Sequence, residues 1–171
     1  MAEPLADQVM RKIKQADELY NRLMLVVAPA GAGKTTALQD VQERVGAPLV
    51  NVNLDLSRRM LDLSERQRAL QLPQLLRDII NDAAGEVILL DNIEMLFDVS
   101  LKQDPLRLLQ GLSRNNTVVA AWNGSSDSDH IIYAVPDHPE YRRYRVGDLL
   151  VASPGGTDTK MTKKITGRHV E

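Results

Sequence analysis

The sequence predicts an α/β protein with an open, mostly parallel sheet and helices on both of its faces. Short apolar runs recur at 23–28, 48–54, 86–90, 117–122 and, more weakly, 148–152. Uninterrupted runs of this length are typical of strands buried on both faces of a parallel sheet. Helical patterns separate most of the runs, and strands that alternate with helices imply crossover connections within one sheet.

The first of these helices is expected at the start of the chain. Behind Pro4, apolar residues recur at helical spacing and predict an amphipathic helix over 4–21. Further along, Ser64 and Gln67 have the spacing of a capping box, which marks a helix start. The proline at the head of 73–84 is expected to open another helix over that range.

Asp104 followed by Pro105 predicts a helix cap and first turn, with the helix reaching residue 114. The last apolar run ends at residue 152. From there the sequence is polar and glycine-rich, which is typical of a flexible tail. We therefore expect one domain over 1–152 and a flexible polar tail over 153–171.

Composition and charge narrow the class of protein. The 171 residues are enough for one domain with a closed core, and 43% are hydrophobic. A net charge of -2 excludes a broadly basic surface, so contact with DNA would need a local patch. The absence of cysteine excludes disulfides and thiolate metal sites. The charged N-terminus and the lack of a run near ~20 apolar residues predict a cytoplasmic protein that does not cross a membrane.

The stretch APAGAGKTT, residues 28–36, follows the first apolar run and leads into a helical pattern, as a phosphate-binding loop does. Its glycines allow backbone N–H groups to point at an anion at the start of the new helix. Lysine would reach the β- and γ-phosphates, and threonine would bind Mg²⁺. The sequence predicts ATP and Mg²⁺ as cofactors, held by Gly31, Ala32, Gly33, Lys34, Thr35 and Thr36.

Ala28 occupies the position where the usual loop pattern has its first glycine. We regard this departure as minor, because the anion-binding backbone depends on the later glycines and on the Lys–Thr pair. The alternative interpretation is an ordinary glycine-rich turn between a strand and a helix.

A metal-bound nucleotide also requires a carboxylate at the end of a neighbouring strand, and VILLDNIEMLF supplies Asp91 there. We predict that Asp91 and Thr35 hold the metal ion. The motif order resembles that of AAA+ ATPases, which carry a water-activating glutamate directly after this aspartate. Asn92 stands in that position, and an amide cannot accept a proton, so hydrolysis is expected to be slow. Glu94 is the next carboxylate, and its direction depends on the turn after Asp91.

Two further sequence features fit the motif order of AAA+ proteins. Asn123 is expected to end a strand beside the first one, where AAA+ proteins carry a polar residue that senses the γ-phosphate; the alternative is a simple Asn-Gly turn. Arg142 and Arg143 lie in HPEYRRYR, in the interval where AAA+ proteins place an arginine that reaches a neighbouring subunit's nucleotide. A short surface helix with solvated arginines, or contact with DNA, are the alternatives for this pair.

The segments DNIE, KQDPLRLLQGLSR and AAWNG together resemble the BrxF family, small P-loop proteins of type-three BREX phage-defence systems in bacteria. The resemblance covers about residues 5–152. It implies a cytoplasmic ATP-binding component of a multi-gene defence system that distinguishes host from phage DNA by methylation, with other BREX proteins as partners.

The sequence therefore predicts a P-loop domain of AAA+-like order without a helical lid domain. Our leading hypothesis is a homo-oligomeric assembly switch that responds to ATP, hydrolyses it weakly and associates with DNA. One alternative is an active DNA-stimulated ATPase motor. Another is a small P-loop kinase, although no arginine-rich lid segment is present to support it.

Overall fold

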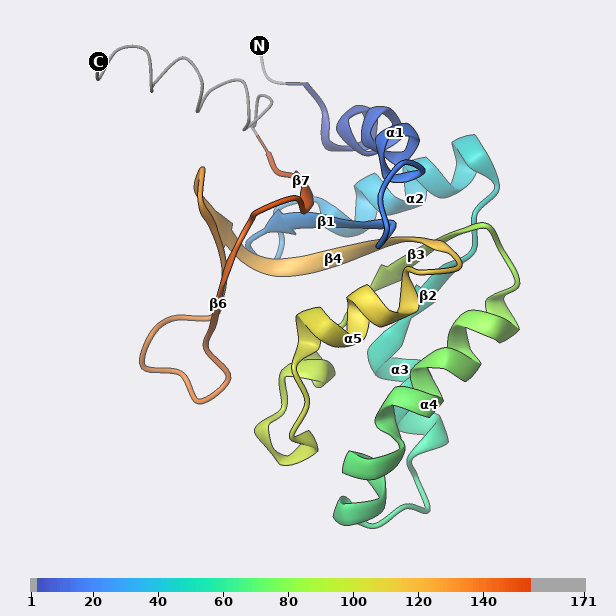
Figure 1. Ribbon diagram of the computed structural model, residues 1–171, viewed down its shortest axis with the longest axis vertical. Coiled ribbons are helices and arrows are strands. Elements are labelled where there is room, and N and C mark those ends of the chain that lie inside the picture. The colour runs from blue at the N-terminus through green and yellow to red at the C-terminus, as the bar shows by residue number, and fades with distance from the viewer. Residues whose placement is uncertain (1–2, 155–171) are drawn as a thin grey trace.

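The structure is a computed structural model that describes residues 3–154. Within that range seven strands form one sheet. Five of them run parallel in the order β2-β3-β4-β1-β7, so both β1 and β3 lie beside the central β4 (Figure 1). The bounds of these five strands are β1 Leu23–Ala28, β2 Leu49–Asn51, β3 Val87–Asp91, β4 Thr117–Ser126 and β7 Leu150–Ala152.

An antiparallel extension that the sequence did not predict continues from β4. The strand runs past the parallel region and pairs with β5 (His130–Tyr133), which in turn pairs with β6 (Arg142–Arg145). The three strands turn away from the parallel sheet at one side of the molecule (Figure 1). Asn123 therefore lies within β4 and does not end it, because pairing with β5 extends the strand by three residues.

Helices cover both faces of the sheet, which confirms the predicted fold class. Helices α1 (Leu5–Ala16) and α2 (Lys34–Val45) lie on one face. The other face is covered by α3 (Val52–Arg59), α4 (Glu65–Ala83) and α5 (Pro105–Leu112), together with the 3-10 helices η1 (Glu94–Phe97) and η2 (Val99–Leu101) (Figure 1).

Alternation along the central strands divides the core into two layers. On β1, Met24 and Val26 pack toward α1 and α2, whereas Leu25 and Val27 pack toward the other three helices. All six residues of β1 are buried. Each such side chain contributes about 1.5–3 kcal/mol when it leaves water, so the strand that carries the phosphate loop is firmly held.

The expected strand over 48–54 is half strand and half helix. It pairs only as far as Asn51, whose side chain accepts a hydrogen bond from the N–H of Leu54 at 3.1 Å. This interaction caps α3, which starts at Val52. A favourable N-cap thus ends the strand even though the apolar pattern continues.

The predicted capping box of Ser64 and Gln67 is present, but the prediction that Pro73 opens a helix is wrong. The proline lies inside α4, where it cannot donate to the carbonyl of Ala69 four residues earlier. The side chain of Gln103 donates to that carbonyl at 2.9 Å instead. A contact from a distant segment therefore satisfies the acceptor that proline leaves without its helical partner.

Two other helices are shorter than expected. Helix α1 ends at Ala16, well before residue 21. Helix α5 begins as predicted, with Asp104 accepting from the N–H groups of the first turn, but it ends at Leu112. No helix among the described residues is long and apolar enough to cross a membrane. Most of the expected tail, residues 155–171, lies outside the described residues.

Candidate functional site

The phosphate loop connects β1 to α2 at the edge of the sheet where the parallel strands end. Gly31 and Gly33 adopt φ values of 81° and 94°, a left-handed conformation that side chains disfavour. A Cβ atom at either position would meet no atom within 4 Å, so the backbone conformation and not the available space requires glycine. Gly33 is the N-cap of α2, so the loop presents the N-terminal end of a helix.

Lys34 is buried, with 6% of its surface exposed, and crosses back over the loop. Its Nζ donates to the carbonyl oxygens of Ala28 at 2.8 Å and Pro29 at 2.9 Å. Burial lowers the pKa of Lys34, while the charges of Glu94 and Asp91 raise it. The residue that departs from the usual pattern, Ala28, thus contributes its carbonyl, which any residue could supply.

Thr35, in the first turn of α2, meets Asp91, the last residue of β3. Thr35 Oγ1 donates to Asp91 Oδ2 at 2.6 Å, and the N–H of Asn92 donates to the other carboxylate oxygen at 2.9 Å. Asp91 is only 7% exposed. A hydroxyl beside a fixed carboxylate is a suitable oxygen donor set for Mg²⁺, so these residues fit the predicted metal ion.

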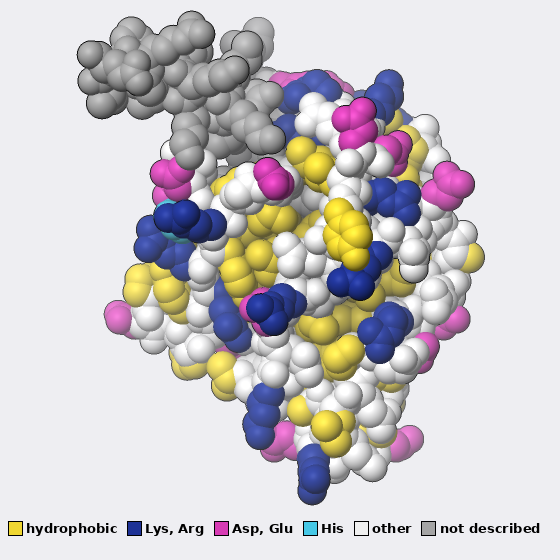
Figure 2. Space-filling view, viewed as in Figure 1, with side chains coloured by type: hydrophobic (Ala, Val, Ile, Leu, Met, Phe, Trp, Pro, Cys, Tyr) yellow, Lys and Arg dark blue, Asp and Glu magenta, His cyan; other side chains and the backbone are white. Residues whose placement is uncertain are grey.

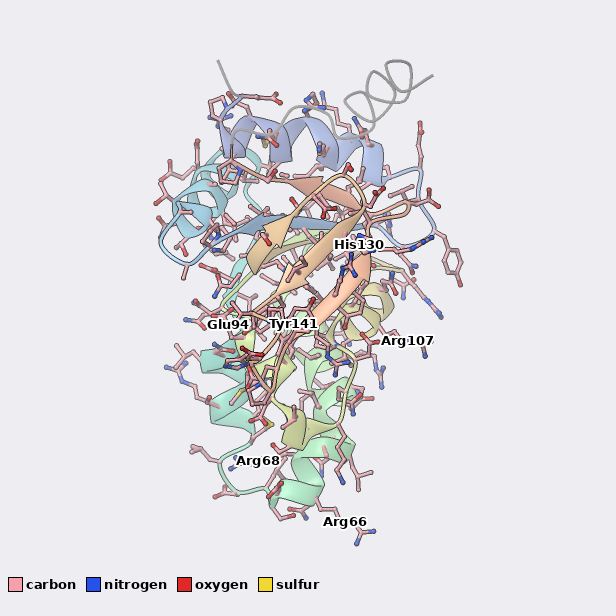
Figure 3. All side chains as sticks on the ribbon, turned by 90° about the vertical axis from the view of Figure 1, so that its left-hand side faces the viewer. Arg66, Arg68, Glu94, Arg107, His130 and Tyr141 are labelled. Carbon is pink, nitrogen blue, oxygen red and sulfur yellow. The ribbon has the colours of Figure 1, made fainter. Side chains whose placement is uncertain are left out.

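The chain turns sharply after Asp91. Asn92 has a φ of 53°, in the left-handed region where asparagine is among the few tolerated residues. The turn brings Glu94 to the sheet edge on which the parallel strands end, as Figure 3 shows. Glu94 is half-buried, and burial, together with the charge of Asp91, raises its pKa.

A cavity of about 390 Å³ unites these groups. Asn123 reaches it because β4 lies beside β1, with Asn123 opposite Ala28. The phosphate loop, two carboxylates and two side-chain amides surround the cavity. Its lining residues are Ala30, Gly31, Gly33, Lys34, Thr35, Thr36, Asp91, Asn92, Glu94 and Asn123. Of the predicted loop residues, Ala32 alone does not line the cavity; its N–H donates to the carbonyl of Pro29.

Arg142 and Arg143 do not line this cavity. They lie on β6 and not on a surface helix, because β6 pairs with β5 along its length. Arg142 Nη2 donates to the carbonyl of Gln103 at 3.2 Å, while Arg143 Nη2 lies 3.4 Å from Nδ1 of His130. Successive strand residues point to opposite faces, so the two arginines serve different surroundings.

Asn53 is a site residue that sequence reasoning missed. Its N–H donates to the carbonyl of Asn92 at 2.8 Å, and its side-chain oxygen accepts from the N–H of Met95 at 2.9 Å. The residue falls in the segment expected to be a strand. Asparagine often caps the start of a helix, and two asparagines end this apolar run. That pattern could have predicted that Asn53 lies in the first turn of a helix.

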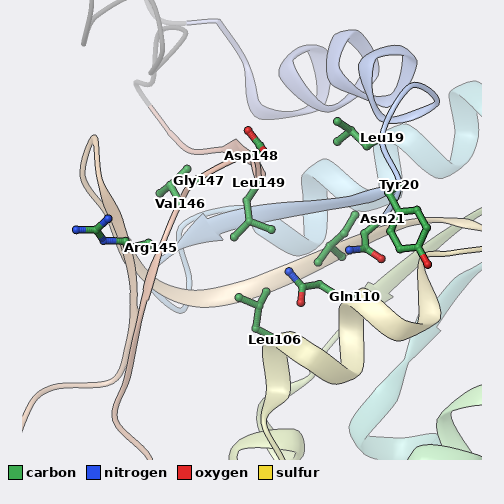
Figure 4. A pocket seen from close by; sticks show the side chains of 11 residues that line it. Leu19, Tyr20, Asn21, Leu106, Gln110, Arg145, Val146, Gly147, Asp148 and Leu149 are labelled. Atoms are coloured by element: carbon green, nitrogen blue, oxygen red, sulfur yellow. The ribbon is translucent and has the colours of Figure 1, made fainter.

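A second cavity of about 390 Å³ lies elsewhere, between the segment 19–23, α5 and the segment 145–149 (Figure 4). It shares no residue with the phosphate-loop cavity, and its lining is mixed, with four leucines among polar residues such as Asn21, Gln110 and Arg145. In the described part of the chain no group of three or more histidine, aspartate or glutamate side chains could hold a metal ion. A metal ion beside Thr35 would therefore need further ligands from phosphate oxygens and water.

The fold and this site define a P-loop nucleotide-binding domain. A buried strand leads into a glycine-containing loop and a lysine at the start of a helix, and an aspartate lies at the end of a nearby strand, as P-loop proteins require. The chain belongs to the AAA family: the family described as "ATPase family associated with various cellular activities (AAA)" matches residues 24–132, more than half of the chain. Proteins of this family bind ATP, typically with Mg²⁺.

No match was found among the curated proteins. Among solved structures the chain is similar to PCH-2 of C. elegans, with 15% sequence identity and a TM-score of 0.41. The similarity covers 87% of this chain and 40% of that one, so the chain spans about two fifths of the length of PCH-2.

Proposed function

We propose that this protein binds ATP and Mg²⁺ in the phosphate-loop cavity and that binding controls its assembly into oligomers. The observation that carries the proposal is the convergence of Lys34, Thr35 and Asp91 in one cavity. A buried lysine beside a hydroxyl–carboxylate pair is the arrangement that holds the β- and γ-phosphates with their metal ion.

We propose that Thr35 and Asp91 provide the protein's ligands to Mg²⁺ and that Lys34 neutralises phosphate charge. Asn123, opposite the start of the loop, is placed to orient the γ-phosphate or a water molecule. The bound metal would supply electrostatic stabilisation of the transferring phosphoryl group. Because the usual base position carries an amide and, among the described residues that line the cavity, the only carboxylate besides Asp91 comes from Glu94, three residues further on, we expect turnover below the ~1–10³ s⁻¹ typical of enzymes.

The proposal of composite sites rests on the exposure of the phosphate loop. Gly31, Thr35 and Thr36 are all exposed, so a bound nucleotide would present a solvent-facing side to a neighbouring subunit. Of the two predicted arginines, Arg143 is exposed and Arg142 is held by Gln103. We therefore favour Arg143 as the arginine that reaches a neighbour's phosphate, where its planar fork of donors matches phosphate oxygens.

Association with DNA is supported by unpaired arginines near α5 and β6. Arg107, Arg114 and Arg145 are exposed, and none forms an ion pair within residues 3–154. Lys and Arg side chains, with apolar side chains between them, are spread over the face that carries α5 and β6 (Figure 2). Guanidinium groups without carboxylate partners are available to phosphates, and such contacts weaken as salt rises.

The biological setting that we propose is a bacterial BREX phage-defence system, with other BREX proteins as partners. The support is the combined resemblance of the DNIE, KQDPLRLLQGLSR and AAWNG segments to the BrxF family. In this setting the protein acts in the cytoplasm as a nucleotide-dependent switch.

The experiment that tests assembly is light scattering after size exclusion, with and without ATP, Mg²⁺ and duplex DNA. We expect a larger species when ATP and Mg²⁺ are both present. A protein that stays monomeric at micromolar concentration with all three added contradicts the assembly switch. Fast turnover that rises with DNA would instead favour the motor, for which the position of Glu94 in the cavity is the supporting observation.

A further inference from the structure

We infer that Glu94 is the general base for hydrolysis and that Asn53 is the residue that positions it. The inference rests on the proposed nucleotide site and adds the group that takes the proton. Position 92 would supply a base in the usual motif order, but it carries an amide here. The structure brings another carboxylate, three residues after Asp91, into the same cavity.

The backbone around residue 92 explains how Glu94 enters the cavity. Asn92 turns the chain in a left-handed conformation, and Ile93 follows with its side chain fully buried. Ile93 anchors the turn in the core, so the next residue starts η1 at the sheet edge. The left-handed φ angle of Asn92 and the buried side chain of Ile93 thus fix the direction in which Glu94 leaves the backbone.

Asn53 holds this turn from both ends. It donates its N–H to the carbonyl of Asn92 and accepts the N–H of Met95 on its side-chain oxygen, so its two hydrogen bonds bracket Glu94. Asn53 lies in the first turn of α3, directly after a strand whose last residue, Asn51, pairs in register with Asp91. Asn53 and Asp91 therefore lie on neighbouring elements that are joined by the pairing of β2 with β3.

The surroundings of Glu94 suit a base. Within the described residues it forms no ion pair, and it shares the cavity with Lys34, Thr35 and Asn123. Burial raises its pKa, which makes the ionised carboxylate a stronger proton acceptor than an exposed one. The carboxylate accepts hydrogen bonds from the backbone at Ile93 and Glu94, which hold it at the cavity, and Lys34 attracts it without forming an ion pair within the described residues.

The step is a hydrolysis in which atoms and charges balance. The Glu94 carboxylate removes a proton from water as the water oxygen forms a bond to the γ-phosphorus. The bond between that phosphorus and the β–γ bridging oxygen breaks, and its electron pair stays on ADP. The proton on Glu94 then passes to solvent, and the products are ADP and inorganic phosphate.

The test separates binding from turnover. Glu94→Gln keeps the shape of the side chain and removes the base, so we expect turnover to fall about 10²-fold or more, with the Kd for ATP changed by less than about threefold. Asn53→Ala removes the acceptor for Met95 N–H, and we expect a fall of about tenfold in turnover with the same Kd. Asn53→Asp restores an acceptor and should recover most of the lost turnover.

If the role of Asn53 is purely structural, Asn53→Ala should lower the melting temperature and should not reduce turnover selectively over ATP binding. In that case Asn53→Asp would not rescue turnover. In the Glu94→Gln background, Asn53→Ala should cost little further turnover, because a positioning residue has no effect without the base. Should Asn53→Ala fail to fold, Glu94→Gln alone decides the role of Glu94. Asn53→Leu, which keeps the size of the side chain and removes the acceptor for Met95 N–H, then replaces Asn53→Ala in the test of Asn53.

Turnover of Glu94→Gln equal to wild type overturns the inference, as does a wild-type protein that binds ATP and never hydrolyses it. Both results leave the proposed nucleotide site intact. A wild-type protein that does not bind ATP in calorimetry overturns the proposed function itself.

Discussion

Thr35 Oγ1 donates a hydrogen bond of 2.6 Å to Asp91 Oδ2, although the two residues are 56 positions apart in the chain. The contact exists because β1 and β3 both lie beside β4 and end at the same edge of the sheet. Since Thr35 lies in the first turn of α2 and Asp91 ends β3, regular secondary structure holds both oxygen atoms in place. The fold by itself therefore brings together the hydroxyl and carboxylate oxygens that the proposed Mg²⁺ site requires.

The first prediction concerns the metal ion. Asp91→Asn keeps the shape of the side chain but removes the charge, so added Mg²⁺ should no longer increase ATP affinity. Calorimetric titration of ATP with Mg²⁺ or with a chelator measures this gain. Asp62→Asn, at an exposed position away from the loop, is the matched control and should keep the wild-type gain. An unchanged gain in Asp91→Asn would remove this residue from the metal site.

The second prediction concerns the phosphates. Lys34→Ala removes the charge aimed at the β- and γ-phosphates, and ATP affinity should fall at least about tenfold, or about 1.4 kcal/mol. Calorimetry measures the loss directly. The fluorescence of Trp122, a buried residue next to Asn123, provides a second readout. Lys14→Ala, on the exposed side of α1, is the control, and equal affinities for the two variants would contradict the site.

The third prediction separates the two arginines of β6. Arg143→Ala should reduce both ATP-dependent assembly and turnover, because an exposed guanidinium is available to a neighbour. Arg142→Ala should have the smaller effect on both, since this side chain already donates to Gln103. Light scattering and phosphate release are the measurements, with Arg66→Ala as an exposed control on α4 (Figure 3). If both β6 variants assemble and turn over like wild type, no arginine of this pair acts between subunits.

A measurement of DNA binding tests the alternative role of Arg143 on β6, which is contact with DNA. If Arg143→Ala weakens DNA binding and leaves assembly intact, the arginine contacts phosphates of DNA. Fluorescence anisotropy with labelled duplex at two salt concentrations measures this effect.

The fourth prediction concerns alkaline stability. Burial raises the pKa of Tyr133 to about 12, and its ring stacks on Phe97 at 3.5 Å between centroids. The unfolded chain therefore loses this proton first, at its ordinary pKa of about 10. The contribution of Tyr133 to the free energy of unfolding should be complete below about pH 10 and decrease toward about pH 12.

Urea unfolding at several alkaline pH values tests this prediction. Tyr133→Phe keeps the stacked ring and should weaken the decrease. Some decrease should remain, because burial and a hydrogen bond to Asp104 also raise the pKa of Tyr144. Tyr20→Phe, at a position 77% exposed, is the control and should decrease like wild type. The same slope in all three proteins would exclude a contribution from Tyr133.

Local chemistry allowed much of the fold to be predicted. Each of the five apolar runs contains a strand of the parallel sheet, although the run over 48–54 is a strand only as far as Asn51. Burial leaves few polar residues in the central strands, which is why the runs are visible in the sequence. The caps at Ser64 and Asp104 were also correct, since a capping side chain acts on backbone only two or three residues away. The grouping of Lys34, Thr35 and Asp91 followed from motif order alone.

By itself, then, the sequence determined the five parallel strands, the phosphate loop and the order of the motifs, because each depends on residues close together in the chain. The tertiary structure decided what depends on distant contacts. Pro73 remains inside a helix because Gln103 reaches Ala69, and β6 exists because β5 pairs with it. The orientation of Glu94 toward the cavity also depends on contacts between distant segments. It depends on a left-handed turn at Asn92 and on two hydrogen bonds with Asn53, which form because α3 follows β2, the strand that pairs with β3.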